Sequence, residues 1–238
     1  MKELDLDAGN SGLKWRLVES GRVIDRGIII YGANAQKWSM PTKGACRAFV
    51  SSVSSKEVDD AIREVLKDIK DVFWAKTASS YGSLVNAYAD YASLGVDRWL
   101  ALIAAYSKYP EDLCVIDCGT AVTVDYVDKF GVHKGGYIAP GGALMLKSLN
   151  VNTAALKGTY GYDSELIPGS STRECIERGV YYMQKAFVLS VARRCAESRI
   201  VCTGGGVKAL LGNDEAYTYV EDLVLDGLRI VANAVPVN

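Results

Sequence analysis

Two short turns, each led by an aspartate, carry the residues best suited to phosphate chemistry. The first is Asp7-Ala8-Gly9-Asn10-Ser11 and the second is Asp117-Cys118-Gly119-Thr120. Glycine lets the backbone approach a phosphate closely, and the amide and hydroxyl side chains add hydrogen-bond donors. Asp7 can hold Mg²⁺ directly or through water, because hard cations prefer oxygen ligands. Taken singly, either turn could equally be an ordinary hairpin turn, where the same residue types are common.

The two turns belong to a longer repeat. Asp7 and Asp117 are separated by 110 residues, and the turn glycines Gly21 and Gly131 have the same separation. Strand-like alternation of apolar and polar residues surrounds both aspartates. We infer an internal duplication. It predicts that the two turns face each other across a cleft and clamp a phosphate from both sides.

A third carboxylate lies at the predicted start of a helix. In Gly95-Val96-Asp97-Arg98 the helix dipole favours the ionised form of Asp97. Phosphoryl transfer needs positioning and charge neutralisation more than a strong base. Asp97 could therefore accept the proton of a substrate hydroxyl beside an arginine. The alternative is an ordinary helix cap.

The triplet Gly204-Gly205-Gly206 follows an apolar strand and opens a short helix, so bare backbone could meet an adenine or a phosphate there. The chain contains no P-loop, and the triplet is not the dinucleotide-binding fingerprint. A tight turn is the alternative.

Hydrophobic periodicity indicates the elements that position these motifs. Alternating apolar residues predict a three-stranded antiparallel meander over residues 1–31. Ser54 with Glu57 and Ser171 with Glu174 have capping-box spacing, which predicts helices over 54–69 and 171–198. Further strands are expected at 47–53, 72–75, 113–117, 200–203 and 216–220, and further helices at 97–106, 143–149, 207–211 and 222–234. The fold class is α/β, with mixed sheets in two similar lobes.

Composition excludes several classes of function. The formal net charge of −1 supplies no field to hold a polyanion, so nucleic-acid binding by bulk charge is not expected. His133 is the only histidine, which excludes a multi-histidine zinc site. The charged N-terminus and the lack of a long apolar run predict a cytoplasmic protein, with no signal peptide and no membrane association. Its six cysteines are expected to be reduced, mostly buried thiols rather than a disulfide framework.

In order, and over nearly the whole chain, these motifs resemble those of the type III pantothenate kinases, in the superfamily of acetate and sugar kinases, heat-shock ATPases and actin. The first turn resembles the first phosphate motif and Asp117–Ala121 resembles the second. The segment from Gly95 to Trp99 resembles the Gly-x-Asp-Arg substrate motif, and Gly136–Gly141 matches a further stretch. The resemblance implies duplicated actin-like ATPase lobes of the ribonuclease H type, with mixed sheets flanked by helices and a cleft between lobes 1–111 and 112–238.

The resemblance also implies an activity, the ATP-dependent phosphorylation of pantothenate to 4'-phosphopantothenate, the first step of coenzyme A biosynthesis. Asp97 would be the catalytic proton acceptor. Asp117 would bind a monovalent cation, K⁺ or NH₄⁺, and Mg²⁺ would accompany ATP at Asp7. The implied ATP-binding residues are Asp7, Ala8, Gly9, Asn10, Ser11, Gly12, Leu13, Lys14 and Thr120. The implied substrate-binding residues are Tyr88, Gly95, Val96, Asp97, Arg98 and Thr172.

Family members are homodimers, so a homodimer is expected here. Two other functions stay open. One is a non-catalytic accessory or regulatory protein on the same scaffold, against which the three acidic residues argue, since an idle site has no physical need for them. The other is a kinase or phosphatase of the superfamily that acts on a sugar or on acetate.

Overall fold

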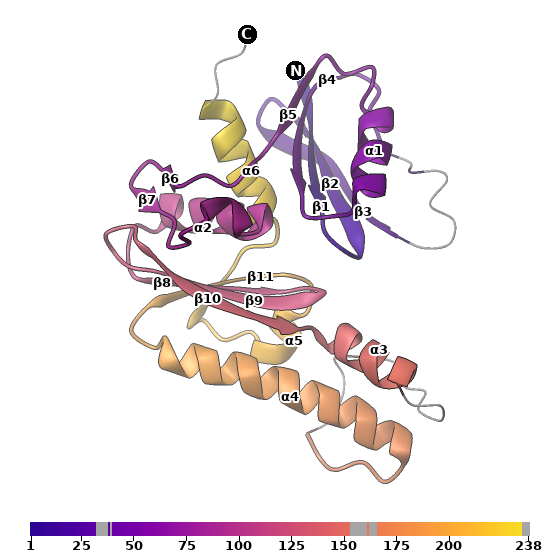
Figure 1. The fold of residues 1–238 in the computed structure, drawn as a ribbon, viewed down its shortest axis with the longest axis vertical. Helices are drawn as coiled ribbons and strands as arrows, with labels where there is room; N and C mark the ends of the chain where they lie inside the picture. Colours follow the sequence, from indigo (N-terminus) through magenta and orange to yellow (C-terminus); the bar gives the residue numbers. More distant parts are fainter. Residues whose placement is uncertain (32–37, 39, 153–160, 162–165, 235–238) are drawn as a thin grey trace. The chain divides into compact units, whose positions relative to one another are not determined.

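The computed structural model describes residues 1–31, 38, 40–152, 161 and 166–234. The chain forms two compact units (Figure 1). The first unit comprises Met1–Lys108 and Asp222–Asn238, and the second comprises Tyr109–Glu221. The lobe division expected from the sequence, at 111/112, differs from these units over residues 109–111 and in the closing segment, which belongs to the first unit. None of the helices in the described part of the chain has the length and apolar character that a membrane crossing requires.

The first unit is built on a five-stranded mixed sheet in the order β3-β2-β1-β4-β5. Its strands are β1 (Lys2–Ala8), β2 (Gly12–Glu19), β3 (Arg22–Ile30), β4 (Ala45–Ser52) and β5 (Asp71–Trp74). The first three form the predicted antiparallel meander, and β4 and β5 then add in parallel. Gly21, with φ of 79°, takes the left-handed turn between β2 and β3, a conformation that glycine adopts without a Cβ penalty.

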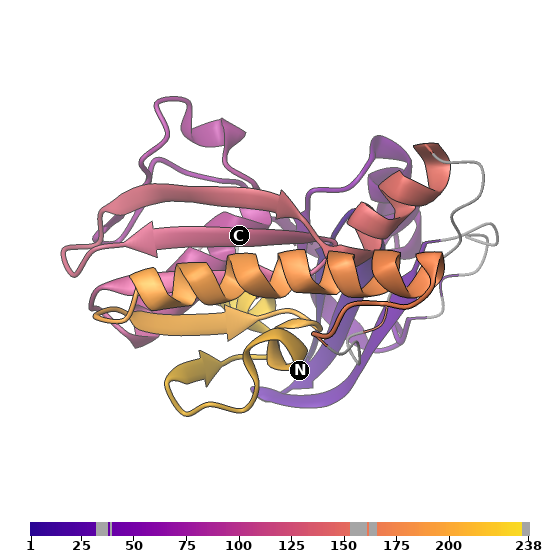
Figure 2. The same cartoon turned by 90° about the horizontal axis from the view of Figure 1, so that it is seen from below.

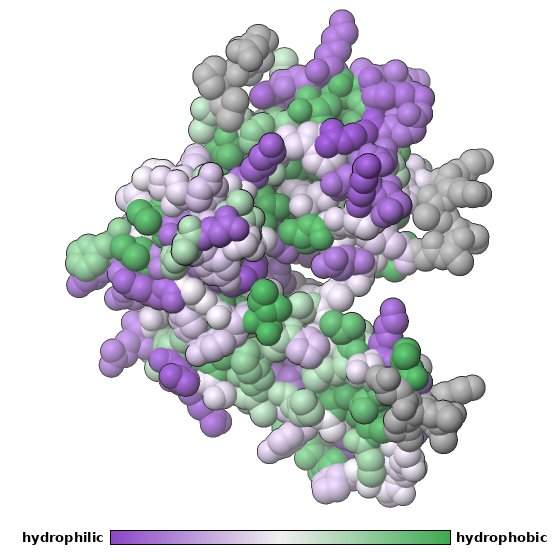
Figure 3. Space-filling model, viewed as in Figure 1, coloured by the Kyte–Doolittle hydropathy of each residue, from purple (hydrophilic) through white to green (hydrophobic). Residues whose placement is uncertain are grey.

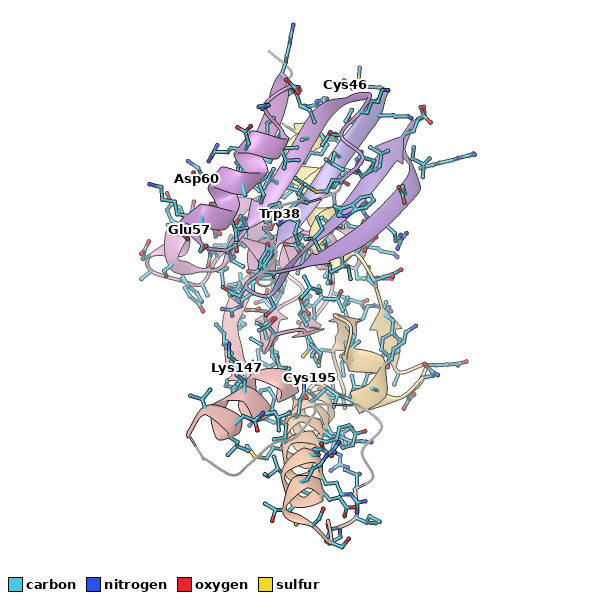
Figure 4. The ribbon with its side chains drawn as sticks, turned by 90° about the vertical axis from the view of Figure 1, so that its right-hand side faces the viewer. Trp38, Cys46, Glu57, Asp60, Lys147 and Cys195 are labelled. Carbon is cyan, nitrogen blue, oxygen red and sulfur yellow. The ribbon has the colours of Figure 1, made fainter. Side chains whose placement is uncertain are left out.

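Helix α1 (Lys56–Val65) covers one face of this sheet (Figure 1). Ile62 and Leu66 pack against Leu4, Leu6 and other buried strand residues in one apolar cluster. Glu57 and Asp60 are exposed and point away from the sheet (Figure 4). The predicted capping box is wrong by one position. Ser55, not Ser54, is the N-cap, and its side chain makes no capping bond to the helix backbone.

The opposite face of the first sheet carries buried charges. Asp5 is fully buried, and its carboxylate accepts hydrogen bonds from Arg16 Nε at 2.8 Å and from Arg229 Nε at 2.9 Å. Arg229 lies on the closing helix α6 (Leu223–Ala234). A Cβ at Gly227 would collide with the backbone of Leu100 in α2 (Val96–Lys108), so this glycine allows the close approach of α6 and α2.

The second unit repeats the topology of the first. Its sheet has the order β10-β9-β8-β11-β12, again an antiparallel meander followed by two parallel strands. The strands are β8 (Leu113–Cys118), β9 (Ala121–Val127), β10 (His133–Pro140), β11 (Arg199–Thr203) and β12 (Tyr217–Tyr219). The duplication predicted from the offset of 110 residues is therefore confirmed.

Three helices complete the second unit: α3 (Gly142–Asn152), α4 (Thr172–Arg194) and α5 (Val207–Leu211). The long helix α4 runs along one face of the sheet (Figure 2), where Tyr181, Val188 and Val191 join Ile116 and other strand residues in a buried cluster. The predicted helix start is confirmed, because the hydroxyl of Ser171 accepts a hydrogen bond from Glu174 N. Cys195 ends α4 (Figure 4).

Residues 76–95 form a loop that carries only short elements. These are β6 (Ser80–Tyr81), β7 (Leu84–Val85) and the 3₁₀ turn η1 (Tyr91–Ser93). The loop connects β5 to α2 and brings Tyr88 and Gly95 into the first unit's site. All six cysteines are free, and four of them are buried, in agreement with the expectation of reduced core thiols.

Candidate active site

Asp7 stands near the end of β1, where a buried hydroxyl holds its carboxylate. In the parallel pairing of β1 and β4, Asp7 lies opposite Ser51, whose side chain is fully buried. Ser51 Oγ donates a hydrogen bond of 3.1 Å to Asp7 Oδ1. The turn that follows is closed by a bond of 3.0 Å from Gly9 N to Gly12 O. Asn10 and Ser11, within this turn, are exposed.

Val53 connects this first turn to the predicted substrate motif. Its backbone N–H donates to Ala8 O at 3.0 Å. A Cβ at Gly95 would lie 3.8 Å from the Val53 side chain. Within the first unit, the residue next to Asp7 and the residue two before Asp97 therefore both border Val53, the first at its backbone and the second at its side chain.

Asp97 is in the first turn of α2 and its carboxylate bends back over the helix start. Oδ1 accepts a hydrogen bond of 2.8 Å from Arg98 N. A Cβ at Gly95 would stand 2.5 Å from the same oxygen, closer than real Cβ contacts allow. Glycine at position 95 therefore leaves room for this carboxylate. The geometry is partly that of a cap, and the side chain is still partly exposed to solvent.

Arg98 and Tyr88 contact each other across the loop. Arg98 is 7% exposed, and its Nη1 donates to Tyr88 Oη at 3.2 Å. The guanidinium carbon lies 5.9 Å from the centre of the tyrosine ring. Two predicted substrate residues that are ten positions apart in the sequence thus meet, at a buried cation on the helix that begins with Asp97 in its first turn.

The second turn has a similar arrangement on β8. Asp117 lies opposite Thr203 in the parallel pairing of β8 and β11, and Thr203 is buried. Gly204 follows with φ of 90°. A Cβ there would collide with Asp117 Oδ1 and stand 2.5 Å from Cys118 O. The first glycine of the triplet is thus required for the close fit against Asp117.

Gly141 encloses the same turn. A Cβ at Gly141 would lie 2.5 Å from Gly119 O and 2.6 Å from Thr120 O, and Gly141 N donates to Thr120 O at 2.9 Å. The side chain of Thr120 remains exposed. The matched stretch that ends at Gly141 therefore fixes the backbone of the second turn and leaves the threonine hydroxyl accessible.

Some predicted site residues offer only backbone. Ala8 and Leu13 are fully buried in the first core, so a ligand could reach their main chain but not their side chains. Val96 is also buried. Lys14 pairs with Asp7 across the β1–β2 hairpin and is partly exposed. Thr172 is exposed at the start of α4 in the second unit.

The structure thus assembles two groups of predicted residues, one in each unit. The first unit brings Tyr88 and Arg98 together, and through Val53 it connects the Asp7 turn to Gly95. The second unit holds Asp117 against Gly204 and the backbone of Thr120 against Gly141. The clamp across a cleft stays a prediction.

Sequence reasoning missed the residues that lie beside the two aspartate turns. Ser51, Thr203 and Val53 all lie at or just beyond the end of a strand parallel to an aspartate-bearing strand. A small hydroxyl residue at the end of each following strand was the available signal. It becomes informative only once the parallel pairing is known.

The oxygen donors at these turns suit hard cations. Among the described residues there is no cluster of three or more histidine, cysteine, aspartate or glutamate side chains that could enclose a metal ion. Mg²⁺ does not need one, since it is commonly held by one or two carboxylates together with substrate phosphates. Burial raises the pKa of the Cys118 thiol, and nearby Asp117 adds to this effect, so Cys118 is not a reactive thiolate.

Comparison with known proteins identifies the family of this chain. The family model described as type III pantothenate kinase matches residues 3–194. A type III pantothenate kinase of Marinobacter nauticus is 34% identical over 243 residues, covering 96% of this chain and 97% of the relative. One from Pseudomonas syringae pv. syringae is 35% identical over 248 residues, covering 95% and 97%.

Solved structures support the fold. A Campylobacter jejuni protein described as a conserved Baf family transcriptional activator has a TM-score of 0.61 at 20% identity, with 97% of each chain covered. A Sinorhizobium meliloti protein described as a candidate 2-dehydro-3-deoxygalactonokinase has a TM-score of 0.55 at 10% identity, with 98% of each chain covered. The two mixed sheets of identical strand order are those of the actin-like ATPase fold. From the family match and the near full-length relatives, the chain belongs to the type III pantothenate kinase family.

Proposed function

We propose that this chain transfers the γ-phosphoryl group of ATP to the primary hydroxyl of pantothenate, with Asp97 as the proton acceptor. The observation that carries the proposal is the space left by Gly95 for the Asp97 carboxylate beside buried Arg98.

The step is a direct displacement. The pantothenate oxygen forms a bond to the γ-phosphorus while the bond between that phosphorus and the ADP oxygen breaks. The hydroxyl proton passes to the Asp97 carboxylate. Such transfers depend mostly on positioning and on neutralising charge, so a carboxylate of ordinary basicity is sufficient.

Arg98 and Tyr88 are proposed to bind the acidic substrate. A buried guanidinium favours a carboxylate ligand, because the charge-assisted hydrogen bond is strong where water is excluded. The tyrosine hydroxyl that already contacts Arg98 holds that side chain in place. Gly95 and Val96 complete the pocket through their backbone.

The first turn, from Asp7 to Lys14, is proposed to hold the ATP phosphates, with Thr120 as a further contact from the second turn. Asp7 would hold Mg²⁺ directly or through water, and its fixed orientation on Ser51 fits that role. Bound Mg²⁺ would neutralise charge that develops on the phosphate oxygens. The backbone around Gly204 and Gly205 is suited to an approaching adenine or phosphate.

Asp117 is proposed to bind a monovalent cation, K⁺ or NH₄⁺. Asp117 Oδ1 and Cys118 O both border the position that a Cβ on Gly204 would fill. A carboxylate and a carbonyl together offer the oxygen ligands that such a cation requires.

We also propose that the protein acts as a homodimer, with Thr172 reaching the substrate. Large hydrophobic residues are exposed on α3 and α4, including Leu144, Leu149 and Met183, and Figure 3 shows hydrophobic colour over this part of the second unit. Sedimentation analysis would give a dimer mass, and a monomer at working concentration would contradict this part of the proposal.

The activity is tested by pantothenate-dependent ADP release with Mg²⁺ and K⁺. Asp97→Asn should lower kcat by about 10²- to 10⁴-fold, the range expected for loss of a general base, with little change in either KM. Asp128→Asn is a matched control, because Asp128 lies in the second unit, shapes the turn before β10 through Phe130 N and Val132 N, and pairs with Lys134. Turnover of a sugar or acetate in place of pantothenate would favour another kinase of the superfamily, and no turnover at all would favour the accessory role.

A further inference from the structure

We propose that Asn86 is a positioning residue that fixes Tyr88 against Arg98 and thereby sets the affinity for pantothenate. The inference rests on the proposed function, since it takes Tyr88 and Arg98 as substrate residues. It adds a residue that neither the motifs nor the composition singled out. Asn86 lies in the loop between β5 and α2.

Asn86 is a buried polar side chain that bonds to both arms of this loop. It is 9% exposed. Its Nδ2 donates to Ala78 O and to Tyr91 O, each at 3.3 Å. Its backbone N–H donates to Ser79 O at 2.9 Å. One residue thus ties the outgoing arm of the loop to the returning arm.

The side-chain oxygen of Asn86 acts directly on Tyr88. Asn86 Oδ1 accepts a hydrogen bond of 3.0 Å from Tyr88 N, the pattern of an Asx turn. This bond fixes the backbone from which the tyrosine side chain extends. Tyr88 Oη in turn accepts a hydrogen bond of 3.2 Å from Arg98 Nη1. Asn86 therefore positions the buried guanidinium through Tyr88.

The chemistry of this position favours asparagine. The amide nitrogen of Asn86 donates to two carbonyl oxygens, and its amide oxygen accepts from a backbone N–H. Only an amide side chain of this length can make all three hydrogen bonds. Aspartate would place acceptor oxygens against the carbonyls of Ala78 and Tyr91. Alanine would leave those buried carbonyls and Tyr88 N without these bonds, which is costly inside a protein.

Steady-state kinetics of the full chain test the inference. Asn86→Ala should raise KM for pantothenate about tenfold, with KM for ATP and kcat each within about twofold, because the loss is confined to substrate placement. Asn86→Ser keeps a side-chain oxygen that can accept from Tyr88 N in a weaker turn. It should therefore restore part of the affinity.

Asp90→Ala is the matched control. The Asp90 side chain caps η1 in the same loop by accepting a hydrogen bond from Ala92 N, so its loss should lower the melting temperature without changing KM for pantothenate. An unchanged pantothenate KM in Asn86→Ser and Asn86→Ala would overturn the inference, as would an equal rise in both KM values. If Asn86→Ala does not fold, Asn86→Ser decides. Absence of pantothenate turnover in the wild-type protein would instead overturn the proposed function, and this inference with it.

Discussion

Ser51 donates a hydrogen bond of 3.1 Å to the carboxylate of Asp7 from the neighbouring parallel strand. The same strand position in the second unit has Thr203 beside Asp117. In both units an aspartate proposed to face phosphate or cation thus lies next to a buried hydroxyl residue. The repeat therefore extends from the aspartates to the residues that flank them.

Replacing Ser51 with alanine should weaken the use of Mg²⁺ and ATP. The charged hydrogen bond contributes roughly 1.5–3 kcal/mol to the orientation of Asp7, so kcat/KM for ATP should fall about tenfold or more. Titrating Mg²⁺ at fixed ATP should show a higher requirement for the metal.

Ser52→Ala is the control for this measurement. Ser52 is the next residue of β4, and its hydroxyl donates to Asp59 on α1 rather than to Asp7. It should leave the Mg²⁺ requirement unchanged. Equal effects of the two substitutions would show that Asp7 does not depend on Ser51.

Gly95→Ala should lower kcat by about 10²-fold or more, because displacing a general base removes most of its contribution. The added Cβ would stand 2.5 Å from Asp97 Oδ1 and force that carboxylate aside. Stopped assays of ADP release, with melting temperature recorded in parallel, separate a displaced carboxylate from an unfolded protein. A folded variant with wild-type kcat would contradict the role of Asp97.

Gly204→Ala should lower both stability and ATP affinity. Left-handed backbone at a non-glycine residue costs about 1–2 kcal/mol, and the new Cβ would also collide with Asp117 and Cys118. Thermal unfolding with and without ATP measures both effects.

Gly205→Ala is the matched control for stability, because a Cβ there meets nothing within 4 Å. Its melting temperature should stay close to that of the wild-type protein. A selective loss of ATP binding in this variant would support contact between the glycine triplet and the nucleotide.

Arg229→Ala should destabilise the first unit by about 3–5 kcal/mol, because it leaves the buried Asp5 charge with one partner fewer. Arg229 Nη2 lies 2.8 Å from Asp5 Oδ1, and Asp5 is fully buried. Lys67→Ala, which removes an exposed pair with Glu64, should leave the free energy of unfolding nearly unchanged, because solvent screens that pair.

The deficit of Arg229→Ala should shrink as the pH falls. Burial raises the pKa of Asp5 above its ordinary value of 3.8, although Arg229 and Arg16 oppose the shift. A carboxyl that binds its proton more tightly when folded adds stability at low pH, and this is lost as the pH rises through the folded pKa. Chemical denaturation at pH 7 and pH 5 should give the smaller difference from wild type at pH 5. A constant difference would show that Asp5 does not titrate in this range.

The sequence by itself determined the repeat and the order of the elements. The periodicity of apolar residues predicts helices and strands from the sequence alone. The separation of 110 residues between Asp7 and Asp117, which Gly21 and Gly131 share, predicts the duplication. The sequence also marked Asp97 and the glycines that border the turns. The sequence predicted Ser54 as the N-cap from its capping-box spacing with Glu57. In the structure the N-cap is Ser55.

Only the tertiary structure showed which residues hold the side chains of the site in place. Whether Ser51 lies beside Asp7 depends on the register of two strands that are far apart in sequence, and whether Asn86 holds Tyr88 depends on how a loop folds back on itself. The closing helix packs with the first unit through Arg229 and Asp5, which are 224 residues apart in the chain. Such pairings are set by long-range packing and buried charge, and local sequence preference carries no information about either.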